Sequence, residues 1–191
     1  MSGRHSAKLG SLFVIAGPSG VGKGTVIRRV RELLPDLELS VSSTTRARRE
    51  GERDGVDYRY VTDEEFDRLI STGALLEWAD IFGHHRSGTP AAAVERARAE
   101  GRDVILEIDV QGARQVREKL PEAVLIFLAP PSIADLGERL RGRATEDEDQ
   151  IARRLDVARR ELDERPRFDH VVVNDDVDRA AREIAAIIAG H

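Results

Sequence analysis

The segment Gly-Pro-Ser-Gly-Val-Gly-Lys-Gly-Thr at residues 17–25 constrains the possible folds of this chain more than any other part of its sequence. An apolar run at residues 12–16 precedes it and is typical of a buried strand, and residues 26–34 follow it with the apolar spacing of a helix. A glycine-rich turn between strand and helix directs several backbone N–H groups inward, and these donors, the positive end of the helix and a lysine form a cradle for phosphate. The sequence therefore predicts a nucleoside triphosphate site built from Gly17, Pro18, Ser19, Gly20, Val21, Gly22, Lys23, Gly24 and Thr25.

The loop departs from the commonest form of this motif at Gly24, where a serine or threonine hydroxyl usually contacts the metal ion. Thr25 follows one position later and is a candidate contact for the α-phosphate, so the metal contact is left open. A flexible glycine turn with a solvated lysine is the alternative interpretation, but the flanking strand and helix patterns favour the phosphate loop. The ending Gly-Lys-Gly-Thr resembles the loop of adenylate kinases and other nucleoside monophosphate kinases.

The composition fits one soluble globular domain of 191 residues, with 40% hydrophobic and 34% charged residues. The net charge of −5 argues against a general nucleic-acid-binding surface, so the many arginines are expected to act locally. Cysteine is absent, which excludes disulfides and thiolate metal sites. The N-terminus lacks an apolar signal segment and no apolar run approaches the ~20 residues that cross a bilayer, so we expect a cytoplasmic protein with no membrane partner.

Apolar runs alternate with helical patterns along the rest of the chain. Buried parallel strands are expected at residues 104–110, 124–129 and 171–173, and a further, alternating strand at 37–41. The helices expected between strands span residues 91–100, 113–119, 133–140 and 178–189. This order predicts an α/β fold, a P-loop NTPase-type parallel sheet flanked by helices, with ligands beyond the carboxyl ends of the strands.

Two segments interrupt this alternation. In the first, Thr62 and Glu65 form a capping box that predicts a helix at residues 63–70. In the second, Thr145 and Glu148 form another capping box, which predicts a long helix toward residue 164.

We interpret the first segment as a substrate lobe and the second as a lid. The expected organisation is a single domain, 1–191, with a core at residues 10–40, 91–138 and 166–191, a substrate lobe at 41–90 and a lid at 139–165.

Short motifs spread over nearly the whole chain carry a family resemblance. They are Gly-Pro-Ser-Gly-Val-Gly-Lys at residues 17–23, Ser-Val-Ser-Ser-Thr-Thr-Arg at 40–46, Gly-Val-Asp-Tyr at 55–58, Leu-Glu-Trp-Ala at 76–79, Ile-Asp-Val-Gln-Gly at 108–112 and Val-Asn-Asp-Asp at 173–176. With them the chain resembles the guanylate kinases, enzymes that transfer a phosphoryl group from ATP to GMP. The serine-threonine-arginine motif followed by Asp-Tyr and Glu-Trp is specific to that family, whereas the first motif alone is not.

The resemblance implies that the segment 41–90 is a GMP-binding lobe. A monophosphate carries about two negative charges at neutral pH, and forked guanidinium groups and hydroxyls suit such a tetrahedral anion. By resemblance, the phosphate contacts are Ser42, Arg46, Arg49 and Tyr58. Without the flanking serines and the tyrosine, these arginines would be interpreted as an ordinary solvated charge run.

The resemblance also implies how the base is recognised. Guanine offers two donors on one edge, N1–H and the 2-amino group, and a carboxylate is their natural partner. Glu77 matches the family residue in that role, Asp109 matches the aspartate that supports it, and Thr89 is a candidate donor to O6. Adenine lacks the 2-amino donor and would leave a buried carboxylate unpaired, at a cost of about 1–3 kcal/mol or more.

The sequence departs from the family at residues 83–89, Gly-His-His-Arg-Ser-Gly-Thr. Many guanylate kinases carry a tyrosine pair here, and in this chain both tyrosines are absent and one residue is inserted. The contact from the second tyrosine is therefore lost or replaced by His85 or Arg86. The adjacent His84 and His85 have no matching third ligand, so we interpret them as solvent-facing residues rather than a metal site.

The resemblance implies that phosphoryl transfer is carried by Lys23, Arg46, Arg139, Arg143 and Arg154. Phosphoryl transfer needs in-line placement and positive charge around the moving group rather than a strong base. Mg²⁺ is expected as cofactor with the co-substrate ATP, with no confident direct protein ligand, held through water near Glu107 and Asp109. The adenine ring is expected near Asn174 and Asp175.

Two other functions are compatible with these motifs. One is a catalytically inactive guanylate-kinase-like module that binds protein partners, although such modules typically lose the phosphate-loop residues retained here. The other is a monophosphate kinase for another base. The expected partners are ATP and GMP, with dGMP left open, and neither nucleic acid nor an obligate protein partner is expected.

Overall fold

The computed structural model describes residues 8–81, 83–142 and 148–191, and its centre is a parallel sheet. The strand order is β2-β7-β1-β8-β9, and every pairing in it is parallel. The strands are β1 (Leu12–Ala16), β2 (Glu38–Leu39), β7 (Val104–Glu107), β8 (Val124–Ala129) and β9 (His170–Val173). The predicted α/β fold with a parallel P-loop-type sheet is confirmed.

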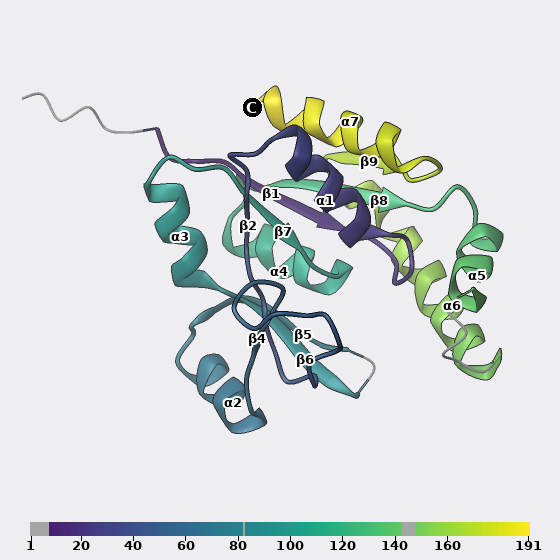
Figure 1. Ribbon diagram of the computed structural model, residues 1–191, viewed down its shortest axis with the longest axis horizontal. Coiled ribbons are helices and arrows are strands. Elements are labelled where there is room, and N and C mark those ends of the chain that lie inside the picture. Colours follow the sequence, from purple (N-terminus) through teal and green to yellow (C-terminus); the bar gives the residue numbers. More distant parts are fainter. Residues whose placement is uncertain (1–7, 82, 143–147) are drawn as a thin grey trace, which may run out of the picture.

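Helices cover both faces of this sheet (Figure 1). Alternate side chains of β1 point to opposite faces, so that Phe13 and Ile15 pack on one side and Leu12 and Val14 on the other. The first face is covered by α1 (Lys23–Leu33) and α7 (Val177–Ala189), and the second by α3 (Ala91–Ala99) and α4 (Val110–Lys119).

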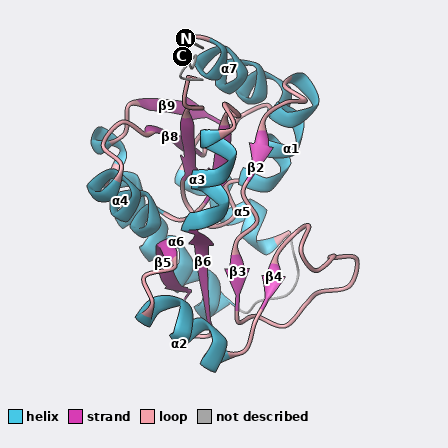
Figure 2. Cartoon of the chain, turned by 90° about the vertical axis from the view of Figure 1, so that its left-hand side faces the viewer, coloured by secondary structure: helices cyan, strands magenta, loops and turns pink. Residues whose placement is uncertain are grey.

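A second, smaller sheet lies beyond the carboxyl ends of the central strands, at the lower side of Figure 2. Its order is β4-β3-β6-β5, and its elements are β3 (Ser43–Thr44), β4 (Arg59–Tyr60), β5 (Leu75–Ile81) and β6 (His85–Pro90), with the helix α2 (Asp63–Ser71) beside them. The capping box predicted at the start of α2 is confirmed, because Thr62 and Glu65 exchange both hydrogen bonds.

A helical pair forms the remaining part of the molecule. It comprises α5 (Ile133–Arg141) and α6 (Glu148–Asp163), followed by the short 3₁₀ helix η1 (Arg165–Arg167). Leu136 and Leu140 of α5 and Ile151 of α6 form a small apolar cluster of their own. Arg143 and the predicted capping residue Thr145 lie outside the described residues.

Several predicted element bounds are wrong. The run at 104–110 is a strand only to Glu107, because Asp109 accepts a hydrogen bond from the Gly112 N–H at 2.7 Å and caps α4, which begins at Val110 instead of residue 113. The segment 37–41 contributes only the two residues of β2, because its ladder with β7 covers only Glu38 and Leu39.

The C-terminal strand β9 lies at the edge of the sheet and is only partly buried. Val172 is fully buried, but Val171 and Val173 are 44% and 43% exposed, contrary to the expectation of a buried strand. Among the described residues, no helix has both the length and the apolar character needed to span a membrane.

Candidate active site

The loop between β1 and α1 has the geometry of a phosphate cradle. Gly20 and Gly22 have φ values of 90° and 96°, which side chains rarely adopt, and these values let the backbone turn into the first turn of α1. A Cβ at Gly22 would also lie 2.9 Å from Nδ2 of Asn174. The Lys23 ammonium donates to the Gly17 carbonyl at 2.6 Å and so lies across the mouth of the loop.

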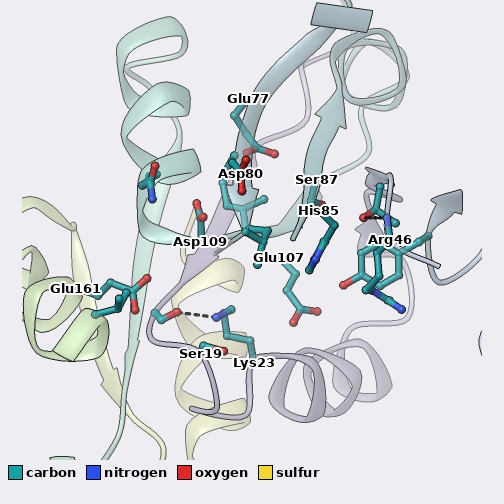
Figure 3. Close-up of a pocket in the computed structure, with 18 of the residues that line it drawn as sticks. Ser19, Lys23, Arg46, Glu77, Asp80, His85, Ser87, Glu107, Asp109 and Glu161 are labelled. Atoms are coloured by element: carbon teal, nitrogen blue, oxygen red, sulfur yellow. Dashed lines mark hydrogen bonds between the residues drawn. The ribbon is translucent and has the colours of Figure 1, made fainter. Parts of the chain in front are cut away.

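One cavity of about 540 Å³ joins this loop to the small sheet (Figure 3). It extends from Ser19 and Lys23, past the carboxyl end of β7, to β5 and β6. The predicted residues that line it are Gly17, Ser19, Lys23, Arg46, Tyr58, Glu77, Glu107 and Asp109. Residues far apart in sequence therefore meet in a single space large enough for nucleotides.

A buried carboxylate lies at the end of the cavity formed by the small sheet. Glu77 on β5 is only 3% exposed, and Thr89 on the neighbouring strand β6 donates its hydroxyl to Oε1 at 2.6 Å. Burial is the main reason that the pKa of Glu77 is raised to about 7, and nearby Asp109 adds to it. A Cβ at Gly112 would lie 2.4 Å from Oε2 of Glu77, so a side chain at this position would displace the carboxylate.

Arg46 and Tyr58 form the next wall of the cavity. Arg46 pairs in bidentate fashion with Glu52, at 3.1 and 2.8 Å, and its guanidinium lies 5.1 Å from the ring centroid of Tyr58. The Tyr60 hydroxyl also donates to Glu52, at 2.6 Å. Hydrogen bonding to Arg46 is the main cause that lowers the pKa of Glu52 to about 2. The arginine is thus held in place before any anion arrives.

The other predicted phosphate contacts lie around this wall. Burial raises the pKa of Tyr58, which keeps its phenol protonated as a donor at neutral pH. Ser42 is buried beside β3, whereas Arg49 is exposed at the rim. Sequence reasoning missed Glu52, because a glutamate in a charge-dense loop carries no signal that distinguishes it from a solvated one.

Two further carboxylates face Lys23. Glu107 ends β7, and burial raises its pKa while Lys23 opposes that shift. Burial likewise raises the pKa of Asp109, and again Lys23 opposes it. A Cβ at Gly24 would lie 3.5 Å from both carboxylate oxygens of Glu107, so this glutamate lies next to the position where most phosphate loops carry a hydroxyl side chain. Among the described residues, no three histidine, aspartate or glutamate side chains converge to hold a metal ion directly.

Two residues of the helix α6 face the phosphate loop at Ser19. Arg154 donates to the Ser19 hydroxyl at 2.6 Å. Glu161, two turns further along α6, faces the Ser19 backbone N–H and Lys23. Burial raises the pKa of Glu161 to about 7. Sequence reasoning missed Glu161, and the i, i+7 spacing from Arg154 is the one signal that could have placed both on one face of the helix.

Arg139 and Asn174 approach the phosphate loop from behind. Arg139 donates to the carbonyls of Val21 and Asn174, at 3.1 and 2.8 Å. The buried Asn174 amide donates to the Val21 carbonyl at 2.7 Å, so both side chains brace the loop. Asp175 is exposed and pairs with Arg179 on α7.

In the segment 83–89, which departs from the family motif, the two candidates for the missing tyrosine contact, His85 and Arg86, point in different directions. Arg86 pairs with Asp67 and Asp63 of α2, at 2.5 and 2.7 Å, and stacks on Phe66. His85 lines the cavity instead (Figure 3). Of the two candidates for replacing the missing tyrosine, only His85 therefore lines the cavity.

The fold and this cavity define a class of protein, the P-loop phosphotransferases. The family model described as Guanylate kinase matches residues 10–191. A guanylate kinase of Corynebacterium glutamicum is 54% identical over 191 residues, which cover 100% of both chains. One of Mycobacterium sp. (strain MCS) is 54% identical over 184 residues, 96% of this chain and 93% of the other.

A solved structure agrees with these relatives. The crystal structure of guanylate kinase from Anaplasma phagocytophilum superimposes with a TM-score of 0.79 and 34% identity, covering 96% of this chain and 86% of that one. The chain belongs to the guanylate kinase family. It is therefore a nucleoside monophosphate kinase by family, as the sequence motifs indicate.

Proposed function

We propose that this chain transfers the γ-phosphoryl group of ATP to GMP, giving ADP and GDP, as an enzyme of purine nucleotide metabolism. The observation that carries the proposal is the single cavity that joins Lys23 of the phosphate loop to Arg46 and the buried Glu77. A donor triphosphate and an acceptor monophosphate bound at its two ends would approach each other through their phosphates.

The acceptor is held by its phosphate and its base. The guanidinium of Arg46, with Arg49, Ser42 and Tyr58, supplies donors for the phosphate dianion. Glu77 as a carboxylate accepts from N1–H and the 2-amino group of guanine. Because Thr89 already donates to one of its oxygens, the carboxylate is oriented before the base arrives. This hydrogen bond uses the single hydroxyl proton of Thr89, so the hydroxyl does not also donate to guanine O6, the contact expected from the resemblance.

The donor is held by the phosphate loop. Lys23 and the loop N–H groups bind its β- and γ-phosphates, and Thr25 contacts the α-phosphate. The buried, acidic side chains Glu107 and Asp109 beside Lys23 fit a Mg²⁺ ion held through its waters. When bound, Mg²⁺ offsets phosphate charge.

The remaining arginines act from the lid. Arg154 lies at the loop and brings positive charge to the transferred group, and Arg143 is proposed for the same role by resemblance alone. The contacts of Arg139 with the loop backbone support a role in holding the loop, in addition to its proposed catalytic role.

Adenine is proposed to lie near Asn174 and Asp175. We further propose ATP and GMP as the physiological partners and the cytoplasm as the location, with neither a nucleic-acid nor an obligate protein partner.

A coupled assay of ADP formation tests the function. With ATP, Mg²⁺ and GMP the protein should form ADP. The Lys23→Ala variant should have a kcat lower by about 10²-fold or more, because it lacks the ammonium group that stabilises negative charge on the phosphates during transfer. GMP binding should persist in that variant. Lys8→Ala, which removes an exposed ammonium that contacts only the C-terminal carbonyl among the described residues, is the matched control. ADP formation that needs no GMP, or none at all, would contradict the proposal.

A further inference from the structure

His85 is placed inside the cavity by the alternation of strand β6. It begins this strand, is half-buried, and lines the cavity beside Ser87, with Arg46 on the facing wall (Figure 3). The next residue, Arg86, points away to α2 and is paired there. The imidazole is therefore the nitrogen-bearing side chain that β6 presents to the cavity.

The surroundings of His85 suit an anion that is not yet bound. Within the described parts of the chain, no hydrogen bond to the ring is found. The charged and titratable groups that face it are Arg46 and Arg49 from the loop after β3, His84 from the hairpin and Asp80 from β5. Asp80 already accepts from the Gly83 N–H at 2.6 Å. Burial, and then the two guanidiniums, lower the pKa of His85, which favours the neutral form of the free ring.

We propose that His85 is a further contact for the acceptor phosphate and that phosphate binding places a proton on its imidazole. This inference rests on the proposed function. A phosphate dianion among Arg46, Arg49 and His85 replaces repulsion between cations by attraction to the anion, which favours the charged ring. The proton comes from the buffer and goes to a ring nitrogen, and no bond to phosphorus forms or breaks.

The sign of the pH dependence follows from this charge. An imidazolium favours the dianion, so phosphate affinity is greatest below the pKa of His85 in the complex and is lost as the pH rises through it. Because the phosphate itself titrates with a pKa of about 6, the useful range lies above that value. Glu77 titrates in the same range, but in the proposed site it contacts the base. Binding of guanosine, which has no phosphate, therefore measures the contribution of Glu77 separately.

Calorimetry at pH 7.5 in buffers of different ionisation enthalpy measures the protons taken up on binding. The uptake with GMP minus that with guanosine should be positive for the unmodified protein and close to zero for His85→Gln. His84→Gln, which changes the exposed neighbour, should keep the uptake. The GMP affinity of His85→Gln should fall by about tenfold at pH 6.5 and by less at pH 8.5.

Ring resonances of His85 in the unmodified protein give a test that needs no variant to fold. Its pKa should rise by about one unit or more when GMP binds and should not rise with guanosine. A GMP complex in which this pKa is unchanged or lower, or in which no extra proton is taken up, would overturn the role of His85 and leave the proposed function standing. Failure to bind GMP at all would instead overturn the proposed function.

Discussion

In the proposed function, discrimination between bases depends on the side chain of Glu77. Its carboxylate is buried, holds one hydroxyl donor from Thr89 and has no cation bonded to it among the described residues. A carboxylate in that state keeps lone pairs for two further donors, which guanine has on one edge and adenine does not. The buried charge thus becomes favourable only when the right base is present.

Replacing this charge should damage guanine recognition selectively. Glu77→Gln keeps the shape but presents an N–H₂ donor to the base, so kcat/KM for GMP should fall by about 10²-fold or more while that for AMP changes little. Steady-state rates with both acceptors measure this. An equal loss for both would show that Glu77 supports the fold of the lobe rather than the reading of the base.

The raised pKa of Glu77 predicts a pH dependence for base binding. With a pKa of about 7 in the free protein, the carboxyl group is protonated at lower pH and must lose its proton to accept from guanine. Guanosine affinity should therefore fall about tenfold per pH unit below 7 and level off above it. Titrations from pH 5.5 to 8 check this, and a slope that persists in Glu77→Gln would assign it to another group.

At the scale of elements, the first turn of α4 is fitted against β5. The turn begins at the Asp109 cap, and Gly112 in it leaves room for the Glu77 carboxylate. The start of α4 and the strand β5 therefore share one packing constraint.

Adding a methyl group to this turn should displace the carboxylate. Gly112→Ala places a Cβ 2.4 Å from Oε2 of Glu77, so KM for GMP should rise by about tenfold or more, although alanine favours a helix by about 1 kcal/mol. KM measurements with GMP and with ATP check this. Gly137→Ala in α5, where the Cβ would meet atoms at 3.4 Å and beyond, is the control and should leave both KM values unchanged. Equal effects of both variants would contradict the packing argument.

An element could be predicted from the sequence where the residues that define it lie close together along the chain. The phosphate loop is one contiguous segment, so its turn between strand and helix can be predicted from the sequence, and Thr62 with Glu65 three residues later predicts the start of α2. The end of β7 was missed because Val110 continues an apolar run into a helix, and only the cap at Asp109 separates the two. Glu161 contacts residues that are distant in sequence, and Glu52 lies in a segment rich in charged residues. The contacts of both side chains therefore depend on the tertiary fold and could not be predicted from the sequence.

At the scale of the whole molecule, two sheets meet at one cavity. The central sheet presents the phosphate loop, the small sheet presents Arg46 and Glu77, and α6 contacts the loop at Ser19. In the proposed function, separate parts of the fold hold the donor and the acceptor, so the relative placement of the two nucleotides depends on how those parts come together. Phosphoryl transfer depends on in-line placement and on positive charge rather than on a strong base, and this division of the fold is suited to placing the two nucleotides.

The acceptor specificity of phosphoryl transfer tests this account most directly. With ATP and Mg²⁺ at saturation, ADP formation is measured as a function of GMP and of AMP concentration. A site that depends on hydrogen bonds to the guanine edge predicts a kcat/KM for GMP at least about 10³-fold above that for AMP. Comparable values for the two acceptors would contradict the central claim that Glu77 selects the base while Arg46 holds its phosphate toward the loop.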